Sequence, residues 1–232
     1  MALKEELEEA VGNIFRESWT ERNGQKVPTP ENLKLGNDAV KLDGTVLYAD
    51  MADSTKLVDG NPPQFAAEIY KTYLTCAAKI VKSEGGSITA YDGDRIMAVF
   101  IGDSKNSTAV RTALKINYAV LNIINPALKR QYQQSEFQLK HVVGIDTSSL
   151  FVSRIGVRND NDLVWVGRAA NYAAKLCAID QHNTVFITGE VFDRLHKDKK
   201  YGGSEKKLMW KERQWSQMGN KRIYSSTWTW KF

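Results

Sequence analysis

The sequence predicts an α+β fold, in which helices pack against a mainly antiparallel sheet in an arrangement related to the split βαβ motif. Strand-like and helix-like patterns alternate from residue 44 onward. The dipeptide Asp92-Gly93 joins two apolar runs, 87–91 and 95–101, and is typical of a tight hairpin between antiparallel strands. The 232 residues, 42% hydrophobic and 25% charged, suit one large globular domain.

The chain is expected to divide at residue 43. Apolar residues at helical spacing predict a helix over 3–15, and the glycines and prolines of 21–41 predict an irregular arm. The compact domain then covers 44–232 and includes the basic, tryptophan-rich C-terminal strands.

Within the compact domain the expected order is strand, helix, hairpin, helix, strand, strand, helix, strand. The ranges, in that order, are 45–50, 63–84, 87–101, 107–124, 136–146, 163–166, 167–179 and 184–187, and a short helix over 190–196 follows. The tail is expected to form closing strands that contain Trp210, Trp215, Trp228 and Trp230.

Composition and missing motifs exclude several classes. The net charge is +5, and residues 197–213 carry seven Lys or Arg against three Asp or Glu. This basic segment suits a polyanion, or is simply a solvated loop face. Two cysteines indicate a reducing compartment, and the apolar run 96–101 is too short to cross a bilayer, so we expect a cytoplasmic protein. The sequence contains neither a P-loop nor a dinucleotide-binding glycine motif.

Two carboxylates are candidates for metal binding. Asp50 ends the first expected strand of the compact domain, and Asp94 follows the hairpin dipeptide. Neighbouring antiparallel strands place such side chains about 5 Å apart, and two divalent cations between them form a clamp for phosphoryl transfer. The alternative is structural, with Asp50 and Asp53 capping the next turn and Asp92-Gly93 only making the hairpin.

The helix expected over 167–179 has two contrasting faces. Arg168, Asn171 and Lys175 share one face, and small residues occupy the other, which permits close packing. A stripe of donors without an acid suits an anionic ligand. An ordinary amphipathic helix with a solvated face is the alternative.

Four motifs in order give a resemblance to a known family. They are Asp50-Met-x-x-Ser-Thr55, Gly93-Asp-Arg-Ile-Met-Ala-Val-Phe100, Val143-Gly-Ile-Asp146 and Val166-Gly-Arg-Ala-Ala-Asn-Tyr-Ala-Ala-Lys175. Over residues 44–195 the chain resembles the class III nucleotidyl cyclase catalytic domain. The resemblance implies the ferredoxin-like core of that family and a homodimer with two composite active sites.

The resemblance also implies residue roles. Asp50 and Asp94 match the family's metal aspartates, and Met51 matches the position whose backbone carbonyl meets a metal, so two divalent ions, Mn²⁺ or Mg²⁺, are expected. Asn171 matches the asparagine that orients the ribose. Lys175 stands where the family usually has arginine, and a lysine keeps the charge but loses the bidentate fork.

Departures from the family concern the base. Ala90 and Val164 occupy the two positions that normally read a purine, and they offer no polar side chain. Tyr91, Arg95 and Trp165 lie beside them. The pattern is similar to the pyrimidine cyclases of bacterial anti-phage (Pycsar) systems, which make cyclic UMP or cyclic CMP from UTP or CTP with manganese and so activate an effector protein. UTP is favoured because arginine donates to O4 of uracil.

The remaining candidates would bind the triphosphate. They are Arg168, Lys211, Arg213 and Lys221, and the last three equally fit a solvated basic tail. The expected reaction is attack of the ribose 3′-hydroxyl on the α-phosphorus with loss of pyrophosphate. The alternatives are a cytidylate cyclase, an adenylate or guanylate cyclase, a silent nucleotide-binding relative, and a nucleic-acid-binding protein that uses the tail. Neither a membrane nor a stable nucleic-acid complex is expected.

Overall fold

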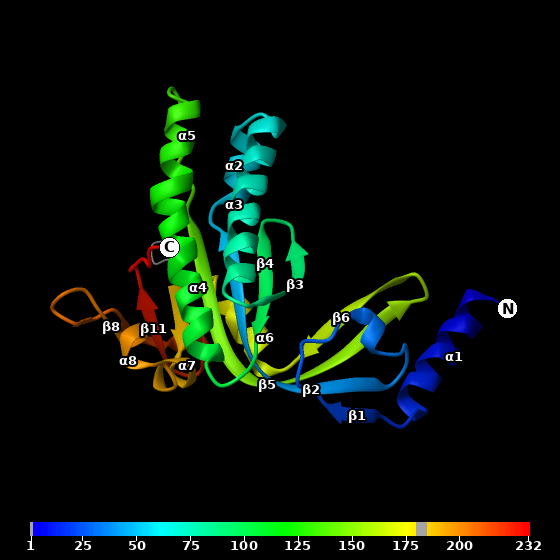
Figure 1. Ribbon diagram of the computed structural model, residues 1–232. Helices are drawn as coiled ribbons and strands as arrows, with labels where there is room; N and C mark the ends of the chain where they lie inside the picture. The colour runs from blue at the N-terminus through cyan, green and yellow to red at the C-terminus, as the bar shows by residue number, and fades with distance from the viewer. Residues whose placement is uncertain (1, 180–184) are drawn as a thin grey trace.

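The computed structural model describes residues 2–179 and 185–232, and within them a nine-stranded sheet organises the fold (Figure 1). The strand order is β10-β11-β7-β5-β2-β4-β3, with β1 beside β2 and β6 beside β5. The strands are β1 (Thr20–Asn23), β2 (Asp38–Met51), β3 (Ser87–Asp92), β4 (Arg95–Phe100), β5 (His141–Val157), β6 (Asp160–Val166), β7 (Val185–Thr188), β10 (Lys211–Trp215) and β11 (Lys221–Ser226). Only the β1–β2 and β5–β7 pairings of this sheet are parallel, which confirms the predicted fold class.

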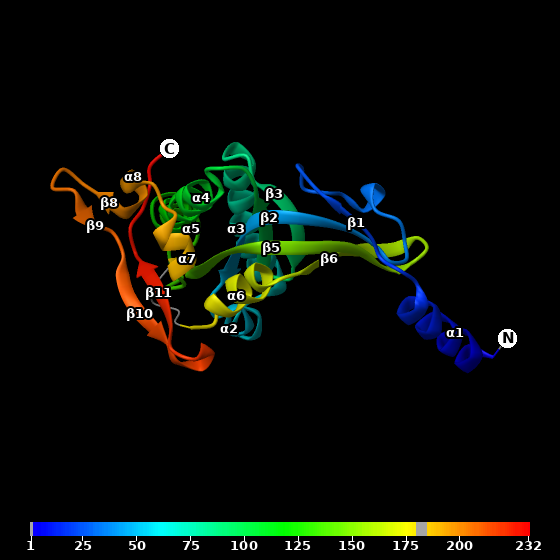
Figure 2. The same ribbon diagram turned by 90° about the horizontal axis from the view of Figure 1, so that it is seen from below.

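Helices cover both faces of the sheet, as Figures 1 and 2 show. Helices α3 (Pro63–Ser83) and α4 (Lys105–Ala119) pack on one face and form most of the main core. Helix α6 (Arg168–Leu176) packs on the other. The shorter elements are η1 (Pro30–Asn32), α2 (Ser54–Gly60), the π-turn η2 (Val120–Ile124), α5 (Asn125–Gln131), α7 (Gly189–Asp193), α8 (Lys197–Lys200), the pair β8 (Tyr201–Gly202) and β9 (Lys207–Leu208), and η3 (Ser216–Met218). None of the helices in the described ranges has the length and apolar content needed to cross a membrane.

A long β-arm extends from the sheet where shorter strands were predicted. Strand β2 begins at Asp38 instead of residue 45, and β5 continues to Val157 instead of ending at 146. Backbone pairing from Ala39–Ser153 onward holds these segments together, and β1 and β6 flank them. Ala39, Val40 and Leu42 are buried in the arm, and ladder hydrogen bonds to β5 hold its backbone. Strand β2 crosses the 43/44 division, which stays a prediction.

The C-terminal tail is only partly as predicted. Strands β10 and β11 are present, but Trp228 and Trp230 lie beyond β11 in an extended segment that packs along α4. The backbone N–H of Trp230 donates to the Leu114 carbonyl at 3.0 Å, and Asn117 Nδ2 donates to the Trp228 carbonyl at 2.9 Å. Trp228 and Trp230 are therefore partly buried against the main core and are not part of a strand. Thr184, the expected start of β7, lies outside the described residues.

Glu84 joins the two helices of the main core. Its nearly buried carboxylate forms ion pairs with Arg111 and Lys115 of α4. Burial raises the pKa of Glu84, but hydrogen bonds from Lys115 and Arg111 outweigh it, and the pKa lies below the usual 4.5. A depressed pKa stabilises the fold above pH 4.5, and the contribution disappears as the pH falls through the folded-state value.

We therefore expect Glu84→Gln to lower the free energy of unfolding at pH 7 by about 1–3 kcal/mol. Urea titrations from pH 7 down to the acid limit of folding should show this difference shrinking below pH 4.5. Glu21→Gln, which opens the exposed pair with Lys41, is the matched control and should change stability by less than about 1 kcal/mol. A Glu84→Gln difference that is independent of pH would contradict this assignment.

Gly144 sets the distance between β5 and α6. A Cβ at this position would lie 2.1 Å from the Ala173 carbonyl oxygen and 2.8 Å from the Leu176 Cβ. Only glycine therefore lets the helix lie this close to the strand.

Gly144→Ala should push α6 away from the sheet and cost about 1–3 kcal/mol of stability. Urea unfolding measures this loss directly. Gly60→Ala serves as the control, because a Cβ there meets nothing within 4 Å. Equal stability of the two variants would show that α6 is not held by this contact.

Candidate active site

Asp50 and Asp94 share one pocket because two adjacent strands meet there. Asp50, near the end of β2, pairs with Arg95 at the start of β4. Asp94 lies in the β3–β4 turn, after Gly93 at φ +61°, and its carbonyl accepts a 3.4 Å hydrogen bond from the Met51 N–H. The pocket, of about 510 Å³, is lined by Asp50, Met51, Asp53, Ser54, Thr55, Lys56, Asp92, Gly93, Asp94 and Arg95.

The pocket favours a cation. Burial, followed by the charge of Asp94, raises the pKa of Asp50 to about 6. A divalent cation near both carboxylates would relieve that cost. Within residues 2–179 and 185–232 no group of three or more His, Cys, Asp or Glu gathers around a metal-sized site. Carboxylate oxygens suit a hard ion such as Mg²⁺ or Mn²⁺, and substrate phosphates and water would supply its other ligands.

Tyr48 contacts Arg95, which lines this pocket, and it was not predicted to do so. Arg95 donates from Nε to Asp92 at 3.0 Å, and its guanidinium lies over the Tyr48 ring, 5.7 Å from the centroid. Tyr48 is half-buried two residues before Asp50, so both side chains face the α6 side of the sheet. That spacing within one strand is the signal that identifies it.

The base-pocket candidates separate onto different faces. Ala90 packs against the cluster beneath α6, whereas Tyr91 is 56% exposed on the opposite face of β3, beside the outer surface of α3. Trp165 packs against the same cluster as Ala90. Val164 precedes it on β6 and points the opposite way. The structure therefore brings Ala90 and Trp165 to one side and separates Tyr91 and Val164 from them.

Asn171 and Lys175 occupy the exposed face of α6, opposite the buried face of Ala170 and Ala173. Lys175 Nζ lies 3.9 Å from the Met218 sulfur, in the turn between β10 and β11. Across the described ranges, no hydrogen bond or ion pair joins Asn171 or Lys175 to Asp50 or Asp94. Neither Asn171 nor Lys175 is among the described residues that line the acidic pocket.

Arg168 is already engaged by its own chain. Its Nε and Nη2 donate to the fully buried carboxylate of Asp146, at 3.0 and 3.3 Å, and Nη1 donates to Glu190 at 2.7 Å. Nη2 also reaches the Thr147 carbonyl at 2.8 Å. These contacts hold the start of α6 against β5 and leave few donors for a triphosphate.

The other basic candidates differ in how close they lie to α6. Lys221 Nζ lies 5.8 Å from the centroid of the Tyr172 ring on α6. Lys211 pairs with Ser225, which lies four residues along β11 from Lys221 and therefore about 13 Å from it. Arg213 extends over the Phe186 ring of β7. Lys221 is therefore the candidate that the fold places beside α6, the helix that carries Asn171 and Lys175.

A buried polar chain supports the floor of the pocket and was not predicted. His141 pairs with Met51 across β2 and β5, and its Nδ1 lies 3.4 Å from the Tyr73 hydroxyl. Its Nε2 lies 3.4 Å from Asn117 Oδ1, and Asn117 also holds the C-terminal segment. Burial lowers the pKa of His141 to about 3, so the ring is neutral at physiological pH. These residues come from distant parts of the chain, so no local pattern identifies them.

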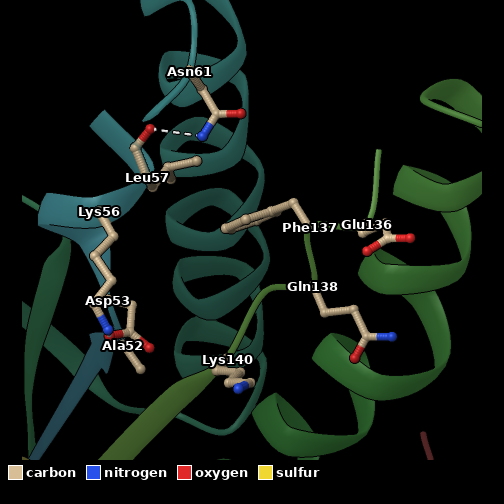
Figure 3. Close-up of a pocket in the computed structure, with 9 residues that line it drawn as sticks. All are labelled: Ala52, Asp53, Lys56, Leu57, Asn61, Glu136, Phe137, Gln138 and Lys140. Carbon is tan, nitrogen blue, oxygen red and sulfur yellow. Dashed lines mark hydrogen bonds and ion pairs between the residues drawn. The ribbon is translucent and has the colours of Figure 1, made fainter. Parts of the chain in front are cut away.

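A second pocket, of about 320 Å³, adjoins the acidic one (Figure 3). The two share Asp53 and Lys56, whose Nζ is 2.8 Å from the Asp53 carboxylate. Figure 3 also shows Asn61 donating to the Leu57 carbonyl at the upper end. Further lining residues are Ala52, Glu136, Phe137, Gln138 and Lys140.

The sequence model of the adenylate and guanylate cyclase catalytic domain matches residues 40–219. The chain belongs to this family. The match confirms the resemblance drawn from the four motifs, and it begins within β2, so it includes most of the β-arm as well as the metal pocket.

Relatives and solved structures agree with this membership. Proteins named uridylate cyclase from Xanthomonas perforans and Burkholderia cepacia are each 50% identical over 232 residues, covering 100% and 99% of this chain and 99% of each relative. The adenylyl cyclase CyaB from P. aeruginosa has the same fold, with a TM-score of 0.67 at 20% identity over 81% of this chain and 95% of that chain. A guanylyl cyclase gives a TM-score of 0.68 at 18% identity, over 82% of this chain and 94% of that chain.

Proposed function

We propose that this cyclase-family enzyme is a uridylate cyclase, which converts UTP into 3′,5′-cyclic UMP and pyrophosphate. The observation that carries the proposal is the 50% identity, over the whole chain, to proteins named uridylate cyclase. The pocket of Asp50 and Asp94 supports it, because two close carboxylates are the donor set that phosphoryl transfer requires.

Asp50, Asp94 and the Met51 carbonyl hold two divalent metal ions in this proposal. The ions, when bound, supply positive charge to the triphosphate and lower the pKa of the ribose hydroxyl. Mn²⁺ is the ion we propose, with Mg²⁺ as the alternative.

The active site is completed by a second copy of the chain. Asn171 and Lys175 are exposed on α6 and are not among the described residues that line the pocket of Asp50 and Asp94 in their own chain, so we infer that a second copy brings these donors to the substrate. A symmetric dimer forms two such composite sites. Asn171 then orients the ribose, and Lys175 and Lys221 neutralise the phosphates.

The reaction is an intramolecular displacement. The ribose 3′-oxygen bonds to the α-phosphorus, the bond from that phosphorus to the β-phosphate oxygen breaks, and pyrophosphate leaves. The hydroxyl proton passes to solvent. Lys175 stabilises the charge that develops during the transfer, as a point charge in place of an arginine fork.

Selection of uracil is assigned to Arg95. Its Asp92 contact and its position over Tyr48 fix the guanidinium, and its Nη1 remains available to donate to O4 of uracil. Ala90 and Trp165 form the apolar wall. Cytosine presents an amino group at the same position, so CTP is the alternative substrate. The product is proposed as a second messenger that activates an effector in anti-phage defence.

The test is incubation of the purified protein with UTP and Mn²⁺, followed by chromatography and a pyrophosphate assay. We expect cyclic UMP and pyrophosphate in equal amounts, and neither from Asp94→Asn. Release of UDP or linear UMP in place of the cyclic product would overturn the proposal.

A further inference from the structure

Helix α1 (Leu3–Arg16) has an apolar face that its own chain leaves uncovered. Leu3, Leu7, Val11 and Ile14 recur on one side of the helix and are 51–69% exposed, and none of its residues is buried. An amphipathic helix of this kind gains stability by burying its apolar face against another surface. Glu5 and Glu9 lie on the opposite side, and Glu6 and Glu8 lie at the two margins of the apolar face.

The helix is held at the far end of the β-arm and cannot fold back. Asn37 Nδ2 donates to the carbonyls of Ile14 and Glu17, at 2.9 and 2.7 Å, and β1 then pairs with β2 immediately afterward. Figures 1 and 2 both place α1 beyond the arm, on the side away from α3 and α4. Whatever covers the apolar face is therefore not the core of the same chain.

A groove on the outer side of α3, against β3, has the complementary character. Its volume is about 420 Å³, and it is lined by Lys71, Leu74, Ala78, Lys79, Lys82 and Tyr91, among others. Leu74 and Ala78 form an apolar floor. Within the described part of the chain, none of the three lysines forms an ion pair.

The two surfaces match in length and charge. The apolar stripe of α1 from Leu3 to Ile14 and the groove from Lys71 to Lys82 are each about 17 Å long. Glu6 and Glu8 lie at the two margins of the first, and three lysines line the second. Apolar contact flanked by opposite charges is the arrangement that gives both affinity and specificity to an interface.

We propose that α1 of one copy docks in the α3–β3 groove of the second copy and so clamps the dimer. This inference rests on the proposed composite site. Strand β6 leads directly into α6, which must approach the metal pocket of the second copy, and β3 leads directly to Asp94 in that pocket. The β-arm of one copy therefore lies beside β3 of the other, and α1 is the next element along the arm.

The docking also assigns a role to Tyr91. Its side chain lines the groove and is 56% exposed, on the face of β3 opposite to Ala90. In the dimer this ring covers one end of α1. Its place is thus in the contact between copies, next to the strand that carries the active-site turn.

The first test replaces Leu7 by aspartate in the full-length protein and measures the dimer dissociation constant by analytical ultracentrifugation. Because Leu7 is 56% exposed in the single chain, the thermal midpoint of the monomer should not change. The dissociation constant should rise at least tenfold. Leu121→Asp is the matched control, since Leu121 is 48% exposed on the distant turn η2, and it should leave the constant unchanged.

Charge exchange gives an independent test. Glu6→Lys with Glu8→Lys should weaken the dimer, Lys79→Glu with Lys82→Glu should weaken it similarly, and the combination of all four should restore it. Increasing salt should weaken the wild-type dimer and reduce these differences.

Failure of the clamp is distinguishable from failure of the proposed activity. If Leu7→Asp and the charge variants dimerise as the wild type does while cyclic UMP is still made, the docking is wrong and the cyclase stands. If the wild type makes no cyclic UMP but the charge exchange still restores a weakened dimer, the clamp stands and the proposed function fails.

Discussion

We expect Asp50→Asn to reduce formation of cyclic UMP by at least about a thousandfold without destabilising the protein. The amide removes a charged metal ligand but keeps the size of the side chain. In the absence of metal, burial and the neighbouring Asp94 raise the pKa of Asp50 to about 6, so its charged form is already disfavoured. Loss of that charge should leave the thermal midpoint unchanged or raise it.

The measurement pairs a product assay over a range of Mn²⁺ concentrations with thermal unfolding in the presence of a chelator. Asp43→Asn is the matched control, because it makes the same substitution on the same strand at an exposed ion pair with Lys105. It should retain activity close to the wild type. Near-full activity of Asp50→Asn would show that the metal pocket has been assigned to the wrong residues.

Mixing two inactive variants restores activity if the site is composite. Asp50→Asn damages the metal half-site, and Lys175→Ala damages the α6 half-site. A heterodimer of the two has one site with both defects and one with neither. Random exchange of equal amounts makes half of the dimers heterodimers, so we expect about a quarter of the wild-type activity.

The control is a mixture of Asp50→Asn with Asp94→Asn, which damages the same half-site in both chains. That mixture should stay inactive at every ratio. Activity in the first mixture must also depend on the time allowed for subunit exchange. If Asp50→Asn and Lys175→Ala never complement although they exchange subunits, each chain contains a complete site, and the composite arrangement is wrong.

The placement of Asp50 and Asp94 in one pocket could be predicted because local patterns determine it. A strand that ends at Asp50 and a hairpin dipeptide before Asp94 require only strand alternation and turn chemistry. The donor face of α6 followed in the same way from helical spacing. Both are properties of a few neighbouring residues.

Which face of β3 each base-pocket residue lies on depends on a β-bulge, and the local sequence gives no clear signal for it. Strand β3 contains a bulge between Ile88 and Ala90, so these residues face opposite sides although they are two apart. The bulge places Ala90 under α6 and Tyr91 in the groove beside α3. Simple alternation from Ile88 would place both of them on the wrong faces.

Long-range contacts explain the remaining differences. Arg168 looks like a free donor in the sequence, but it binds Asp146 and Glu190, each 22 residues away. The outer half of β2 pairs with β5 and buries Ala39, Val40 and Leu42, but the glycines and prolines before it make 21–41 look irregular in the sequence. Only the folded chain brings these partners together.

The most direct test of the central proposal is a competition among UTP, CTP, ATP and GTP at equal concentrations with Mn²⁺, in which the cyclic products are separated and quantified. We expect cyclic UMP to be the main product, because Arg95 is proposed to donate to O4 of uracil and Ala90 offers nothing to a purine. Mainly cyclic AMP or cyclic GMP, or no cyclic product at all, would contradict it.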